Sequence, residues 1–234
     1  MACYGGGDKQ MISEEKKFIF IHVPKAGGTT IEHHILEYAK DCSYGCSWAR
    51  RTKNFRNKGM FDLLKNHPDY FSFSFVRNPF SRAVSLWKRN SDLNQLDFNV
   101  FLERAYKFVK SKPESYFYNQ EDNRTNITRK DFFEKIPYEF HDSGSIGYHL
   151  LPQKYFFING CDFIGSIENF QSDWDYVCKK VGIPPSELFH KNKSAKKKHF
   201  SEYYDESAKE MLIDMYQDDF TFLKENGFNY SLND

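Results

Sequence analysis

Two parts of the chain each combine a short apolar run, a turn and an amphipathic stretch. Residues 18–23 are almost continuously apolar and aromatic and stop at Pro24, which is typical of a strand buried on both faces. Apolar positions at helical spacing follow over residues 30–40. Residues 71–76 alternate between apolar and polar, and Asn78-Pro79 then begins a second helical pattern. Two strand–turn–helix units predict an α/β fold with a parallel sheet.

Periodicity and helix-end signals predict the remaining elements. We expect helices over 98–109 and 169–181, short strands over 155–158 and 163–166, and one long helix over 205–225. Ser207 and Glu210 form a capping pattern near the start of the long helix, and Asn226-Gly227 form its stop. The glycine-rich start favours a flexible N-terminal tail over residues 1–16, followed by a single domain over residues 17–234.

Composition narrows the class of protein. With 234 residues, 40% hydrophobic and 18% aromatic, the chain has ample apolar surface for one core, which excludes wholesale disorder. A formal net charge of +1 argues against a globally basic nucleic-acid-binding protein. No apolar run approaches the roughly 20 residues of a membrane-spanning helix, and the start lacks a signal-peptide pattern. Five scattered cysteines indicate ordinary thiols and no metal site, so we expect a cytoplasmic protein.

The turn after the first strand has the composition of an anion-binding loop. Two glycines, Gly27 and Gly28, let backbone N–H groups curl around an anion, and the following helix N-terminus adds positive potential. Thr29 and Thr30 add hydroxyl donors, and Lys25 adds a mobile charge. The P-loop of nucleoside triphosphatases is a different motif, because its lysine follows the last glycine. On pattern alone, the choice lies between an anion site and a tight strand–helix connection.

The turn after the second strand carries a guanidinium and a hydroxyl. Arg77 leaves the carboxyl end of the strand, where open α/β sheets bind ligands, and Ser85 lies about two helical turns further on. Such a pair is suited to a phosphate monoester, although a lone arginine here also serves as a cap or an ion-pair partner. Two such turns together indicate one ligand with two separated phosphates.

At this point the residues resemble a known family. Residues 21–30 resemble the 5′-phosphosulfate loop of the Golgi-type carbohydrate sulfotransferases, with the sequence Ile-His-Val-Pro-Lys-Ala-Gly-Gly-Thr-Thr. Residues 75–85 resemble the 3′-phosphate motif of the same family. By motif, the small bacterial members and heparan sulfate 2-O-sulfotransferase are the most similar. Further blocks resemble the family in the expected order, at residues 149–153, 163–174 and 203–219. The resemblance implies a P-loop-like three-layer sandwich, with a central parallel sheet flanked by helices.

The resemblance also implies a reaction. The family transfers a sulfuryl group from 3′-phosphoadenosine 5′-phosphosulfate (PAPS) to an acceptor hydroxyl, usually on a carbohydrate, and needs no metal. Lys25 would stabilise charge on the leaving group, while Arg77 and Ser85 would hold the 3′-phosphate. The 5′-phosphate would be held by backbone N–H groups and hydroxyls of Ala26, Gly27, Gly28, Thr29 and Thr30. A lysine-rich segment at 190–199 is either a solvated loop or, as the resemblance implies, a loop that closes over the donor through Lys193 and Ser194.

The general base is left open among the histidines. The position around Asn57, where heparan sulfate 2-O-sulfotransferase has its catalytic histidine, carries none here. His67 and His149 are the candidates, while His22 reads as a structural residue at a strand end. Aromatic residues that stack on sugar rings would come from Trp48, Trp87, Tyr116 and Tyr118.

Two other functions compete with the sulfotransferase reading. One is a nucleotide or small-molecule kinase, because strand–glycine loop–helix turns also serve ATP. The other is a nucleotide- or glycan-binding protein of the same fold that has lost its base. The identity of the donor separates the first from a sulfotransferase, and turnover separates the second.

Overall fold

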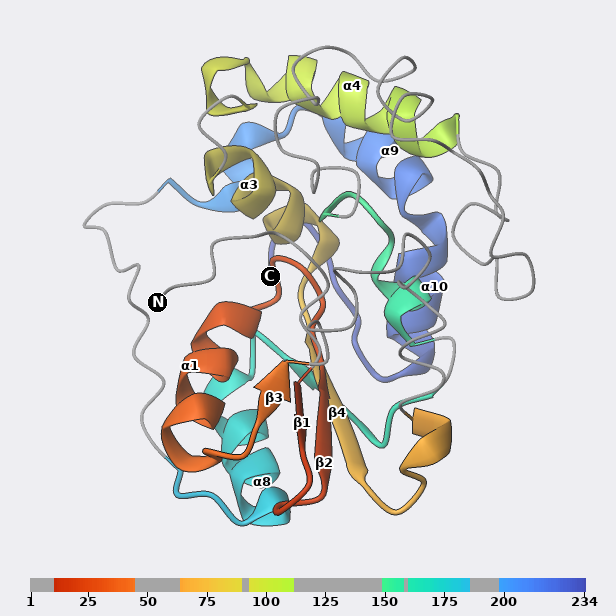
Figure 1. Cartoon of the computed structure of the whole chain (residues 1–234). Coiled ribbons are helices and arrows are strands. Elements are labelled where there is room, and N and C mark those ends of the chain that lie inside the picture. Colours follow the sequence, from red (N-terminus) through yellow and green to blue (C-terminus); the bar gives the residue numbers. More distant parts are fainter. Residues whose placement is uncertain (1–10, 45–63, 90–92, 112–148, 158–159, 186–197) are drawn as a thin grey trace, which may run out of the picture. The chain divides into compact units, whose positions relative to one another are not determined.

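The computed structural model describes residues 11–44, 64–89, 93–111, 149–157, 160–185 and 198–234 (Figure 1). The chain divides into two compact units. The sheet unit comprises Gly7–Arg77 and Phe156–Lys197, and the helical unit comprises Met1–Gly6, Asn78–Tyr155 and Lys198–Asp234. The single domain expected over residues 17–234 therefore consists of two units, each with its own core.

The sheet unit is built on five strands in the order β3-β1-β2-β4-β5. Its parallel part is β2, β4 and β5, in which Phe20 pairs with Phe73 and Phe73 with Phe163. β1 runs antiparallel to β2 and to β3. The bounds are β1 Met11–Ser13, β2 Phe18–Ile21, β3 Ser43–Tyr44, β4 Phe71–Val76 and β5 Phe163–Ser166. The predicted α/β fold with central parallel strands is confirmed.

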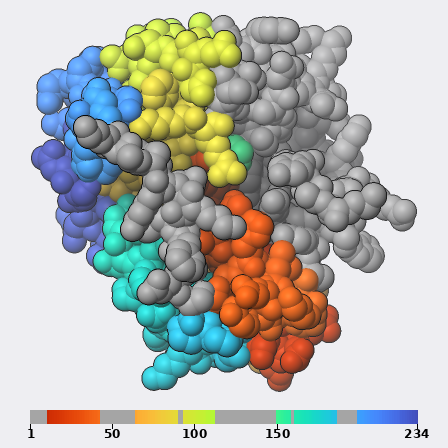
Figure 2. All heavy atoms as spheres, turned by 90° about the vertical axis from the view of Figure 1, so that its left-hand side faces the viewer, coloured from red at the N-terminus to blue at the C-terminus, as the bar shows by residue number. Residues whose placement is uncertain are grey.

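Two helices cover one face of this sheet, α1 Gly28–Tyr38 and α8 Phe170–Val181. Figures 1 and 2 show the two helices side by side, α1 in orange and α8 in cyan. Their apolar sides bury Trp174 against the alternate phenylalanines of β4, with the Trp174 ring centroid 6.3 Å from that of Phe73. This packing fixes the start of α1 at the end of β2, where the predicted anion loop lies.

Residues 11–16, which the sequence analysis places in a flexible N-terminal tail, are part of the fold. Met11, Ile12 and Ser13 are buried in β1, and the Ser13 hydroxyl donates to the Asp41 carboxylate at 2.9 Å. A strand of three residues carries too little periodicity to be recognised in the sequence, because its pairing with β2 is what defines it. Residues 11–16 therefore belong to the sheet unit, and the expected tail over 1–16 is corrected for them.

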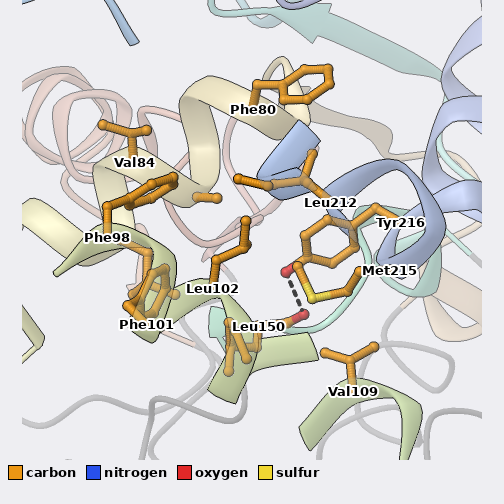
Figure 3. Close-up of a cluster of buried hydrophobic side chains, with 14 of the residues drawn as sticks. Phe80, Val84, Phe98, Phe101, Leu102, Val109, Leu150, Leu212, Met215 and Tyr216 are labelled. Carbon is orange, nitrogen blue, oxygen red and sulfur yellow. Dashed lines mark hydrogen bonds between the residues drawn. The ribbon is translucent and has the colours of Figure 1, made fainter. Parts of the chain in front are cut away.

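The helical unit packs helices and short 3₁₀ turns around a second core (Figure 3). None of the described helices is both long and apolar enough to cross a membrane. The core side chains come from α3, α4, α9 and the segment around Leu150. The elements are α3 Pro79–Arg89, η2 Leu93–Gln95, α4 Phe98–Lys110, η4 Gln153–Phe156, η5 Phe200–Tyr203, α9 Glu206–Met215 and α10 Gln217–Glu225.

Two predicted elements are wrong, and a buried tyrosine and aspartate explain both. The long helix expected over 205–225 is broken at Tyr216, whose hydroxyl donates to the Leu150 carbonyl at 2.9 Å (Figure 3). Tyr155 and Phe156, within the strand expected over 155–158, instead belong to the 3₁₀ turn η4, whose first N–H groups donate to the Asp219 carboxylate. α9 is capped by Asp205, which accepts from the Ala208 N–H, and not by Ser207.

Candidate functional site

The loop between β2 and α1 has an unusual backbone. Lys25 has a φ of 67° and Gly27 a φ of 77°, so two left-handed residues flank Ala26. A non-glycine residue in this region costs about 1–2 kcal/mol and persists only where its surroundings impose it. Such outliers cluster at ligand sites, because alternating backbone conformations point successive N–H groups to one side. The predicted anion-binding loop is therefore strained at Lys25.

The first turn of α1 adds positive potential to this loop. Its N-cap is Gly27, which has no side chain that could cap the helix, and its first turn carries no acidic residue. The first N–H groups of a helix have no partner within the helix, and the aligned peptide dipoles place partial positive charge there. Thr29 is exposed and Thr30 half-buried in the same turn. This arrangement suits an anion, as the sequence predicted.

The two glycines are required for two different steric reasons. A Cβ on Gly27 would lie 2.4 Å from Ile167 Cδ1 and 3.3 Å from Phe170 Cζ, in addition to needing a left-handed backbone. A Cβ on Gly28 would lie 2.5 Å from Cε1 of the His22 ring. Packing against β5, α8 and the end of β2 thus demands glycine at both positions. The tight strand–helix connection, which the sequence left open beside an anion site, is therefore part of the reason for both glycines.

A histidine–carboxylate pair lies behind the loop. The Nδ1 atom of His22, just after β2, lies 2.5 Å from Oε1 of Glu32 in α1. The Glu32 side chain is 4% exposed and the His22 side chain 15% exposed. The structural role expected for His22 agrees with this contact. The sequence does not predict that Glu32 pairs with His22, because only the fold brings a helix residue ten positions along the chain back onto the strand end.

Arg77 reaches the same loop from the neighbouring strand. It follows the carboxyl end of β4, which pairs in parallel with β2, and its Nη1 atom donates to the Lys25 carbonyl at 3.3 Å. The arginine is half-buried. The structure therefore brings together the lysine and the arginine that the two sequence motifs contributed, at adjacent strand ends where α/β sheets bind ligands.

The other residues of the second motif lie on α3 in the helical unit. Asn78 caps this helix by accepting from the Phe80 N–H at 2.9 Å, which confirms the predicted start. Ser85 is half-buried in the second turn. Arg82, in contrast, is only 2% exposed, and its Nη2 donates to the carbonyls of His149 and Leu151 at 2.9 and 2.8 Å. The motif thus contains one arginine at the loop and one buried arginine.

A buried carboxylate completes the contacts around the His149 segment. Asp219 in α10 is fully buried and accepts the N–H groups of Gln153 and Lys154 at 2.8 and 2.9 Å. Burial raises the pKa of Asp219, and the positive charge of Arg82 opposes that rise. Two sequence blocks far apart along the chain, at 149–153 and 216–219, therefore meet in one polar network.

The two candidate bases are placed differently. His149 is half-buried, and its carbonyl is held by Arg82. His67 is half-buried in the turn before β4, with its ring centroid 4.6 Å from that of Tyr70. The whole of β4 separates His67 from Arg77, so the two lie at opposite ends of that strand. Lys193 and Ser194 lie outside the described residues, as do Trp48, Tyr116 and Tyr118.

Trp87, the remaining aromatic candidate, lines a cavity of about 330 Å³ in the helical unit. Its ring centroid lies 5.4 Å from those of Phe98 and Tyr203. Among the described residues, Asn99 Oδ1 is buried without a hydrogen-bond partner. The cavity is lined by Trp87, Asp97, Phe98, Asn99, Lys198, Glu202 and Tyr203. The lining thus combines three aromatic rings with four polar or charged side chains.

The described cysteines are thiols, buried at Cys42 and Cys178 and half-buried at Cys161. Cys42, Cys161 and Cys178 are free, and burial raises the pKa of each to about 12. In the part of the chain that the structure describes, no three His, Cys, Asp or Glu side chains gather as possible metal ligands.

Comparison with known proteins gives a consistent picture. A model described as the sulfotransferase family matches residues 8–229, across both units. Carbohydrate sulfotransferase 14 from Danio rerio is 27% identical over 122 residues, which cover 49% of this chain and 31% of that protein. The matched region thus spans about a third of the relative. No solved structure matches the chain.

Proposed function

The chain belongs to the sulfotransferase family, and we propose that it transfers a sulfuryl group from PAPS to a hydroxyl of a carbohydrate. One observation carries this proposal more than any other. The Arg77 guanidinium, from the end of β4, contacts the backbone carbonyl of Lys25 in the loop after the adjacent parallel strand β2, beside a helix whose N-cap is a glycine. Positive charge and backbone N–H groups are what a donor with two separated phosphates requires.

The donor is held by the two motifs. Backbone N–H groups of the Lys25 loop and the hydroxyls of Thr29 and Thr30 bind the 5′-phosphate, which fits the uncapped first turn of α1. Arg77 and Ser85 bind the 3′-phosphate, and the lysine-rich segment with Lys193 and Ser194 closes over the nucleotide. The left-handed backbone at Lys25 supports this assignment, because it pre-orients the loop before the donor arrives.

The transfer is an in-line displacement at sulfur. A new S–O bond forms to the acceptor oxygen while the S–O bond to the 5′-phosphate breaks, and the bond electrons stay with the leaving 3′,5′-bisphosphate. By analogy with phosphoryl transfer, positioning and charge stabilisation supply most of the rate. Lys25 stabilises the charge that develops on the bridging oxygen, and a general base takes the proton of the attacking hydroxyl.

Of the two histidines, His149 is the base that we propose. His67 precedes β4, whereas the Lys25 loop and Arg77 lie at the carboxyl ends of β2 and β4. His149 begins the segment that Arg82 and Asp219 hold with buried hydrogen bonds. A general base must be held in position, and the hydrogen bonds that hold the backbone of this segment within the helical unit support the choice of His149.

A carbohydrate acceptor is proposed from the relative and from the cavity at Trp87. The name of the relative, carbohydrate sulfotransferase 14, says that it acts on a carbohydrate, and its similarity to part of this chain supports a sugar acceptor here. In the helical unit, the rings of Trp87 and Tyr203 line the cavity together with Asp97, Asn99 and Lys198. Aromatic faces stack on sugar rings, and carboxylate, amide and ammonium groups bind hydroxyls, so this cavity would hold one unit of the acceptor.

The donor assignment is tested by thermal shift with 3′,5′-adenosine bisphosphate, ATP-magnesium and AMP. Bisphosphate at about 100 times its Kd should stabilise the native state by about 2.7 kcal/mol, which raises Tm by roughly 5–11 °C for a chain of this length. We expect the shift to disappear in Lys25→Ala and Arg77→Ala and to persist in Lys40→Ala, which removes an exposed lysine just after α1. A shift with ATP-magnesium alone would overturn the proposal in favour of a kinase.

A further inference from the structure

The His22–Glu32 pair links the strand before the donor loop to the helix after it. His22 directly follows β2, and Glu32 lies in the second turn of α1, so their 2.5 Å contact spans the whole loop. Glu32 is nearly inaccessible to solvent. A buried carboxylate costs several kcal/mol unless a hydrogen-bond partner compensates it, and His22 is such a partner. An apolar residue at this position would bury at lower cost, so stability alone does not account for the pair.

The His22 ring also sets the position of the loop itself. It packs against Gly28, the first residue of α1, closely enough that a Cβ there would approach three ring atoms within 2.5–2.7 Å. The ring further contacts Phe20 of β2, with centroids 6.0 Å apart. The Nδ1 atom of the imidazole thus contacts Glu32. The same ring limits how closely the first turn of α1 can approach the end of β2.

We propose that His22 and Glu32 are positioning residues that hold the first turn of α1 and the Lys25 loop in the donor-binding geometry. Glu32 fixes the orientation of the His22 ring, and the ring supports Gly28, whose N–H belongs to the first turn of α1. This inference rests on the proposed function, because it assigns a role to residues behind the donor site. On this proposal, glycine is required at position 28 because the His22 ring packs against it, and not because the phosphate approaches it.

The first test measures bisphosphate affinity by isothermal titration calorimetry in Glu32→Gln, Glu32→Ala and His22→Ala. Hydrogen bonds to charged groups are strong enough that we expect Kd to rise about 10-fold or more in His22→Ala and Glu32→Ala. Glu32→Gln keeps an acceptor and the side-chain volume, so it should restore part of the affinity. Glu37→Gln, an exposed carboxylate on the same helix, is the matched control and should bind as the wild type does.

The second test separates positioning from general stability. Gly28→Ala should weaken binding in the wild-type background, because the new Cβ displaces the His22 ring. In the His22→Ala background the obstacle is gone, so His22→Ala/Gly28→Ala should bind no more weakly than His22→Ala alone. If Gly28 instead makes room for the phosphate, the substitution will cost the same factor in both backgrounds, and the proposal is wrong.

Three outcomes are distinguishable. Wild-type protein that fails to bind the bisphosphate contradicts the proposed function itself. Wild-type binding with unchanged Kd in His22→Ala and Glu32→Ala overturns the positioning role alone. Weaker binding in the variants, with ligand-free Tm values that show them to be folded during the titration and with non-additive behaviour at Gly28, supports it.

Discussion

Replacing each of the two arginines of the second motif by methionine should have different effects: Arg82→Met should lower stability, and Arg77→Met should weaken bisphosphate binding. Arg82→Met removes a buried guanidinium that donates to two carbonyls and lies beside the buried Asp219. Arg77→Met removes a half-buried guanidinium that donates to one carbonyl of the donor loop. Methionine keeps much of the side-chain volume, so each change reports mainly on the charge and its hydrogen bonds.

The expected magnitudes follow from burial. Removing one partner of a buried charge pair costs about 3–5 kcal/mol, so Arg82→Met should lower Tm by roughly 6–20 °C. Arg77→Met loses one hydrogen bond near the surface, worth about 0.5–1.5 kcal/mol. Its effect on ligand binding is the larger one. Loss of an arginine–phosphate contact should raise the Kd for 3′,5′-adenosine bisphosphate by about 10-fold or more.

Both quantities are measured on the same three proteins. Denaturant unfolding gives the free energy of unfolding, and calorimetric titration at a temperature where every variant is folded gives Kd. The reasoning is refuted if Arg82→Met unfolds with the wild-type midpoint, or if Arg77→Met loses as much stability as Arg82→Met while it retains bisphosphate affinity.

Further experiments test separate features of the sheet unit. Lys25→Gly should stabilise the ligand-free protein by about 1 kcal/mol, because it relieves a left-handed lysine, and should weaken bisphosphate binding; a lower unfolding free energy would contradict the strain. Gly27→Ala should destabilise by more than about 2 kcal/mol in denaturant unfolding, because the strained backbone adds to a Cβ 2.4 Å from Ile167, and wild-type stability would contradict this packing. Cys42 and Cys178, with pKa values raised by burial from 9.0 to about 12, should resist iodoacetamide at pH 8 in the native state and react in urea, as peptide mass mapping would show. Because a raised folded-state pKa stabilises the protein below the unfolded value, that contribution is complete below pH 9 and is lost as the pH rises towards 12.

The elements that flank the donor loop are predictable because their signals are local. The alternation over Phe71–Val76 and the Asn78-Pro79 pair give β4 and the start of α3 correctly. Gly182, at the end of α8, is left-handed as a helix stop requires. These features depend on residues within a few positions of one another, so the sequence contains them.

The features that escape prediction depend on distant partners. β1 is defined by its pairing with β2 and β3, and the boundary between α9 and α10 falls at Tyr216, whose hydroxyl reaches the distant Leu150 carbonyl. In the site, the direction of Arg82 depends on a segment more than sixty residues further along the chain. A motif fixes residue type and spacing, but it does not tell a ligand-binding arginine from a buried one.

The central claim is tested most directly by turnover with PAPS and a panel of oligosaccharides and polysaccharides. We predict that 3′,5′-adenosine bisphosphate and sulfated glycan accumulate in equal amounts with at least one acceptor. Lys25→Ala should lower kcat by about 100-fold or more, the usual loss when a charge-stabilising group is removed. Donor binding without transfer to any acceptor, or Lys25→Ala with wild-type kcat, would contradict the account.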